Sequence, residues 1–129
     1  MTYREEFTAK IKKTFKTETA AYKRREKAYE FVTEYFGDLL DELYDETEAV
    51  EEELGIDYER IKFKDKELQV EFGKDTFTIY SRDIKSGDKQ TIDLLEDNGH
   101  TYTSKKHNSP LNEELLDQYL KETFAETLG

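Results

Sequence analysis

Apolar residues recur at helical spacing through the first part of the chain. An apolar side chain stands at every seventh position six times in succession, and others fall on the flank of the same stripe. The seven-spaced residues are Phe15, Tyr22, Tyr29, Phe36, Leu43 and Val50. No proline interrupts this region, and Gly55 follows Leu54 as a residue suited to the left-handed conformation that ends many helices. The pattern predicts a helical block over residues 1–55 that stops at Gly55.

A single helix across this block would be long for a domain of this size. At 1.5 Å per residue, about 50 residues would reach roughly 75 Å. Three threonines, which are poor helix-interior residues, lie within residues 14–20. We therefore expect a kink or break near residues 14–20, unless a second chain covers the apolar stripe.

From Tyr58 onward the apolar period changes from about 3.6 residues to two, which is typical of half-buried strands. Polar and glycine-rich turns separate the strand candidates, and residues 100–104 form a weaker fifth candidate. The alternating residues of the four stronger candidates are Ile61 with Phe63, Leu68 with Val70 and Phe72, Phe77 with Ile79, and Ile92 with Leu94. Because the connections are short, we expect an antiparallel meander of four to five strands over residues 58–104, apolar on one face.

The last segment, residues 109–128, returns to helical spacing. Ser109 fits the N-cap position and Pro110 the first helical position. We expect this helix to pack on the apolar face of the sheet. The predicted fold class is therefore α+β, with residues 1–129 forming one domain.

Composition agrees with a folded chain that has a heavily solvated surface. Charged residues make up 40% of the 129 residues, but the 13% aromatic content is enough to close a core. The net charge of −11 disfavours nucleic acid and anionic membranes as partners. Cysteine is absent and the N-terminus lacks a long apolar run, so we expect a cytoplasmic protein without disulfides.

The chain carries no recognisable catalytic or metal-binding motif. Its two histidines, His100 and His107, lack a second ligand at a usable spacing, and nucleophile, phosphate-loop and EF-hand patterns are all missing. We therefore predict no metal, no cofactor and no catalytic residue, and we interpret both histidines as residues of a connecting segment.

Charge is distributed very unevenly along the chain. Residues 1–36 hold nine Lys or Arg against six acids, whereas residues 37–59 hold eleven acids and no base. Acidic residues at the C-terminal end of a helix oppose its macrodipole, so this run is expected to lower the stability of the helix end. No basic residue within the run offsets this effect. The candidate partner-binding residues are Asp41, Glu42, Asp45, Glu46, Glu48, Glu51, Glu52 and Glu53.

Three explanations fit the acidic run: a solvated surface, pairing with the basic stretch of the same helical block within or between chains, or a docking surface for a basic protein. We favour a non-catalytic protein-binding module, in concrete form an acidic inhibitor or immunity-type protein that docks a basic partner through the acidic helix end. The alternative is a homodimeric structural or regulatory protein whose long N-terminal helix is the interface. An enzyme that uses a carboxylate site ranks third.

Overall fold

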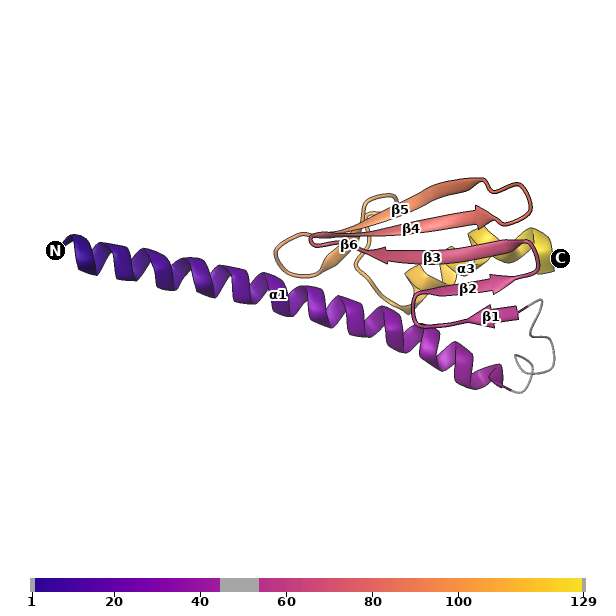
Figure 1. The fold of residues 1–129 in the computed structure, drawn as a ribbon, viewed down its shortest axis with the longest axis horizontal. Coiled ribbons are helices and arrows are strands. Elements are labelled where there is room, and N and C mark those ends of the chain that lie inside the picture. The colour runs from indigo at the N-terminus through magenta and orange to yellow at the C-terminus, as the bar shows by residue number, and fades with distance from the viewer. Residues whose placement is uncertain (1, 45–53, 129) are drawn as a thin grey trace.

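The computed structural model describes residues 2–44 and 54–128 and confirms the α+β architecture. A long helix, α1 (Tyr3–Glu42), precedes a six-stranded sheet, and a second helix, α3 (Glu113–Leu128), follows it (Figure 1). The strands are β1 (Leu54–Ile56), β2 (Arg60–Phe63), β3 (Lys66–Phe72), β4 (Thr76–Asp83), β5 (Lys89–Asp97) and β6 (Tyr102–Ser104).

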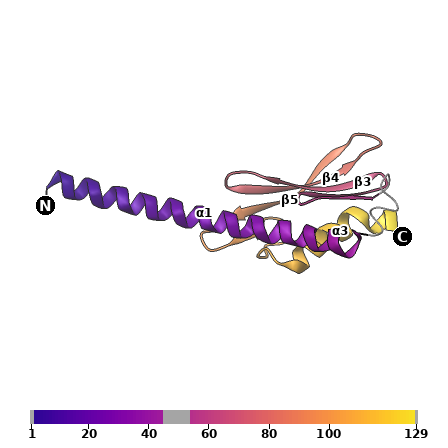
Figure 2. The same cartoon turned by 60° about the horizontal axis from the view of Figure 1, so that its bottom comes forward.

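The sheet is the predicted antiparallel meander, with its strands in the order of the sequence. It has one strand more than the four to five expected, because Leu54–Ile56 pairs with Ile61–Phe63 to form β1. The weak candidate around Tyr102 is real and forms β6. Both helices lie against the same face of the sheet, so the other face meets solvent (Figure 2).

The break expected near residues 14–20 was wrong, since α1 runs without interruption through that segment. The hydroxyls of Thr14 and Thr17 donate to the carbonyl oxygens of Lys10 and Lys13, each at 3.0 Å. Because each hydroxyl bonds the preceding helical turn, these threonines do not compete with the helix for its backbone.

The predicted stop at Gly55 was also wrong, because α1 ends at Glu42 and Gly55 lies in β1 opposite Lys62. The last turn of α1 contains no basic side chain. The electrostatic cost of acids at a helix C-terminus favours an earlier end, which the apolar spacing alone could not reveal.

Because of a register shift in β5, the residues of this strand that lie on the core face differ from those predicted. Ile92 and Leu94 were expected on the core face, but Asp93 and Leu95 are the buried residues. Ile79 pairs with Asp93, and a bulge directly after this pair leaves one extra residue in β5. One extra residue exchanges the two faces of a strand, so the alternation changes phase at this point.

The C-terminal helix begins later than residue 109. The side chain of Asn112 accepts a hydrogen bond from the backbone N–H of Leu115 at 2.8 Å and serves as the N-cap in place of Ser109. Pro110 instead forms an isolated bridge with Thr103, which extends the edge of the sheet beside β6.

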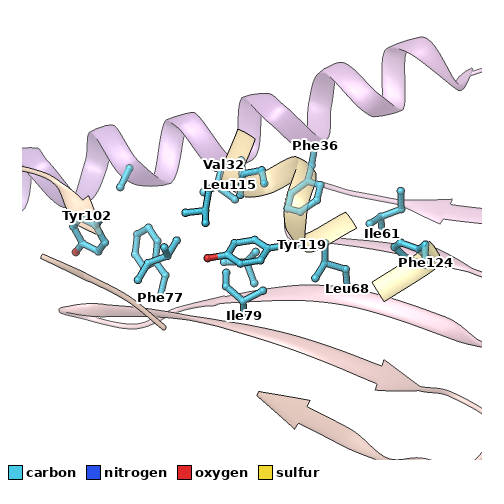
Figure 3. Packing of buried hydrophobic residues seen from close by; sticks show 14 residues of the cluster. Val32, Phe36, Ile61, Leu68, Phe77, Ile79, Tyr102, Leu115, Tyr119 and Phe124 are labelled. Atoms are coloured by element: carbon cyan, nitrogen blue, oxygen red, sulfur yellow. The ribbon is translucent and has the colours of Figure 1, made fainter. Parts of the chain in front are cut away.

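The hydrophobic core lies between the sheet and the two helices (Figure 3). Only the second half of α1 contributes to it, and α3 contributes Leu115, Leu116, Tyr119 and Phe124 on the same face of the sheet. The core residues are Ala28, Val32, Phe36, Ile61, Leu68, Val70, Phe77, Ile79, Leu95, Tyr102, Leu115, Leu116, Tyr119 and Phe124.

Two phenylalanines of the same seven-residue repeat provide a test of this arrangement. Phe36 is 1% exposed and Phe15 is 64% exposed. We expect Phe36→Ala to lower the free energy of unfolding by about 3–5 kcal/mol and Phe15→Ala by no more than about 0.5 kcal/mol. Urea denaturation at sub-micromolar protein, where association contributes least, measures both. Equal losses would contradict the burial pattern.

Candidate functional site

The N-terminal half of α1 projects beyond the sheet and α3 (Figure 1). Every residue from Thr2 to Ala20 is exposed, and the first buried residue of the helix is Ala28. We call residues 3–20 the arm. A helical segment of this length has little intrinsic stability in water, since most helical stability in proteins comes from packing of an apolar face.

The arm nevertheless carries an apolar stripe, which begins on the arm and ends at Tyr22 where the helix meets the sheet. The exposed fractions of these residues are large. The stripe residues are Tyr3 (79% exposed), Phe7 (53%), Ile11 (40%), Phe15 (64%) and Tyr22 (61%). Since a large aromatic side chain offers about 150–250 Å², the stripe exposes on the order of 500 Å², as much as the largest apolar patch of a typical monomer.

Two arginines fix the point where the helix leaves the sheet. The Nε of Arg24 lies 2.8 Å from Oδ1 of Asp97 at the end of β5, and this hydrogen bond lowers the pKa of the Asp97 carboxyl. The Nε of Arg25 donates to the carbonyl oxygen of Gly73 at 3.0 Å, with its guanidinium 5.7 Å from the ring centre of Phe77. These contacts hold the direction in which the arm projects.

The structure describes only part of the acidic segment predicted to bind a partner. Asp41 and Glu42 lie exposed in the last turn of α1. Tyr44 and Tyr58, 57% and 59% exposed, lie near that end of the helix, and Tyr58 contacts Gly37. Six further candidates lie outside the described residues: Asp45, Glu46, Glu48, Glu51, Glu52 and Glu53.

A buried carboxylate that sequence reasoning missed joins β5, β6 and α3. The hydroxyls of Ser104 and Tyr119 both donate to Oδ2 of Asp93, and the backbone N–H of Lys106 donates to its Oδ1 at 3.0 Å. Burial alone would raise the pKa of Asp93, but these donors outweigh burial and lower it. Burial and the contact with Asp93 raise the pKa of Tyr119. Because donors surround the carboxylate, it acts as a structural anchor.

The histidines occupy separate places. His107 lies in the connection between β6 and α3, with Nε2 3.4 Å from Oε1 of Glu122. His100 lines an open hollow of about 340 Å³ between α1 and the β5–β6 turn, together with Arg24 and Glu34. Among the residues that the structure describes, no three His, Asp or Glu side chains gather closely enough to hold a metal ion.

No protein-family profile, curated protein or solved structure matches this chain. In the two described ranges, no helix combines the length and apolar character that crossing a bilayer requires.

The stripe is readable in the sequence, but its exposure is not. Phe15 and Phe36 occupy equivalent positions of one repeat, and only the fold shows which of them meets the sheet. The sequence did not indicate that Asp93 is buried, because an acid within an alternating strand is ordinarily assigned to the solvent face.

The anchoring role of Asp93 predicts a pH-dependent stability. Because the folded state lowers the pKa of Asp93, its contribution is present above the unfolded pKa and is lost as pH falls below about 4. At pH 7 we expect Asp93→Asn to lower the free energy of unfolding by about 2–4 kcal/mol. The difference from wild type should shrink progressively below about pH 4.

Urea denaturation followed by circular dichroism at several pH values measures this. Glu71→Gln, an equivalent change at an exposed position of β3, is the matched control and should leave stability nearly unchanged. A stability difference for Asp93→Asn that stays constant from pH 7 to pH 3 would contradict the anchoring role.

Proposed function

We propose that this protein is a non-catalytic association module whose projecting arm packs against another helix. The observation that carries the proposal is the exposed stripe from Tyr3 to Tyr22 on a helix whose first 18 residues are all exposed. Apolar positions at helical spacing on an exposed helix are the usual anchors of helix-to-helix recognition.

The remaining features of the chain support a binding role. Arg24 and Arg25 tie the helix to β5 and to the β3–β4 turn, so the arm is presented in a defined direction. A held direction reduces the entropy lost on association. The buried carboxylate of Asp93 is already surrounded by donors from its own fold, which favours a structural role for it.

Removal of the two central phenylalanines tests this function. We expect Phe7→Ala with Phe15→Ala to abolish association while leaving the fold intact, because neither ring contributes to the core. The matched control is Lys13→Ala with Lys16→Ala, which removes two long side chains from the opposite side of the helix.

The measurement is sedimentation velocity with fluorescence detection, on labelled chain both in buffer and in clarified cell extract. Wild type and the lysine control should sediment as a complex in at least one of these, and the phenylalanine variant as a monomer in both. A wild-type chain that sediments as a monomer in both would contradict an association function.

The acidic end of α1 supports a second candidate function, docking of a basic protein. Asp38, Asp41 and Glu42 are exposed there, and within residues 2–44 and 54–128 no salt bridge joins them to a basic side chain. Tyr44 and Tyr58 add exposed aromatic surface near the same end. A basic partner would offset the unfavourable position of these acids at the helix C-terminus.

Neutralising the acids tests whether they have a stability cost. We expect Asp41→Asn with Glu42→Gln to raise the free energy of unfolding by about 0.3–1 kcal/mol per residue. Glu113→Gln is the matched control, since it removes an acid from the favourable first turn of α3 and should lower stability. Thermal denaturation measures both. A loss of stability from Asp41→Asn with Glu42→Gln would show that these acids are paired within the fold.

A further inference from the structure

The stripe face of the arm contains two charged residues as well as its apolar ones. Five positions lie within about 80° of one another around a helix of 3.6 residues per turn. They are Arg4, Phe7, Ile11, Phe15 and Glu18. Both charged residues are exposed, and neither takes part in a salt bridge within the described parts of the chain.

The spacing of these five positions is symmetric about Ile11. Phe7 and Phe15 stand four residues to either side of Ile11, and Arg4 and Glu18 stand seven residues to either side. The apolar residues are therefore repeated about the centre, whereas the charges at the two ends are opposite in sign. A segment with this symmetry is complementary to itself when a second copy runs antiparallel to it.

The exposed length of the helix has the same centre. Exposure is unbroken from the first helical residue, Tyr3, to Ala20, so Ile11 lies near the middle of the arm. Two antiparallel arms that cross at Ile11 therefore overlap along their whole exposed length. Tyr3 of each arm then lies level with Thr19 of the other, five residues before Arg24 bonds to the sheet.

From these observations, and resting on the association function proposed above, we propose that the partner of the arm is the arm of a second copy of this chain, paired antiparallel about Ile11. Phe7 of one chain then faces Phe15 of the other, and Arg4 faces Glu18, each contact occurring twice. Tyr3 of one arm and Tyr22 of the other lie at the same end of the pair, separated by about three residues of helical rise.

The exposed area is comparable with what a dimer needs. Two stripes, with Tyr3 and Tyr22 included, expose about 1,000 Å² of apolar surface, which reaches the lower limit of specific protein interfaces when nearly all of it is buried. Pairing with Arg4 also satisfies the carboxylate of Glu18, which lies at one end of the stripe face. A lipid surface would instead bury that carboxylate among acyl chains at a cost of several kcal/mol.

Charge exchange between Arg4 and Glu18 tests the orientation. In an antiparallel pair, Arg4→Glu or Glu18→Arg alone sets like charges opposite each other at both ends of the interface. Each variant should raise the dissociation constant about tenfold or more. The double variant with both substitutions exchanges the two charges and should restore the wild-type value. Lys13→Glu is the control, because it makes a similar charge change away from the stripe.

Cysteine cross-linking tests the register. Because the chain has no native cysteine, each introduced cysteine can form a disulfide only with another introduced cysteine. Under mild oxidation, Ile11→Cys should form a disulfide-linked dimer. Arg4→Cys alone and Glu18→Cys alone should not, whereas an equimolar mixture of these two variants should form the mixed dimer. Cross-linking of all three variants by themselves would indicate parallel arms and overturn the proposal.

Sedimentation equilibrium of the purified chain, with flotation on phosphatidylcholine–phosphatidylserine vesicles, separates the remaining outcomes. A dimer that Phe7→Ala with Phe15→Ala converts to a monomer supports the proposal. A pure chain that is monomeric but enters a complex in extract overturns the second copy as partner and leaves the association function intact. A chain that is monomeric both when pure and in extract overturns the second copy as partner and the association function as well. Flotation of a monomeric chain with vesicles overturns self-pairing in favour of a lipid surface.

Discussion

The central constraint on this molecule is that α1 is longer than the sheet on which it packs. A helix of 40 residues extends about 60 Å, whereas the longest strand, of nine residues, spans about 30 Å. The sheet and α3 can therefore cover only part of the stripe. Phe36 is buried and Phe15 is not, although both belong to one repeat. The same sequence pattern thus serves the core at one end of the helix and leaves an exposed apolar stripe at the other.

An overhanging helix is useful as a binding element only if its direction is fixed. Arg24 and Arg25 connect α1 to the sheet, and the hydroxyl of Tyr35 donates to Asp117 of α3. Burial and the contact with Asp117 raise the pKa of Tyr35, so its hydroxyl remains a donor at neutral pH. Since α1 is held by the sheet and by the neighbouring helix α3, the arm continues a helix whose orientation the fold determines.

The sequence predicted the larger elements because each has a clear period, and it failed where one residue or a competing interaction changed the outcome. Gly55 was assigned to a helix end because glycine is common there, but it pairs in β1. Asn112 replaced Ser109 as the cap, and both residue types suit that position equally well. The bulge in β5 could not be read from alternation, since Ile92 and Leu94 give a regular pattern by themselves.

The candidate site was predictable to a similar degree. The acidic run is visible as a charge pattern, and Asp41 and Glu42 do lie exposed at the end of α1. The spacing of Arg4, Ile11 and Glu18 is also present in the sequence, but its meaning depends on where the sheet begins to cover the helix. That position is set by tertiary contacts at Arg24 and Ala28, which no local pattern reports.

An exposed aromatic stripe carries a risk of open-ended association, and two features of this chain oppose it. Pairing of a self-complementary stripe about a two-fold axis uses the same surface on both chains, so the assembly closes at two copies. The net charge of −11 per chain then repels further copies. The arm has the opposite sign, since residues 3–20 hold five Lys or Arg against three acids. Two arms therefore also repel each other weakly, and the apolar contacts about Ile11 with the two Arg4–Glu18 pairs have to outweigh that repulsion.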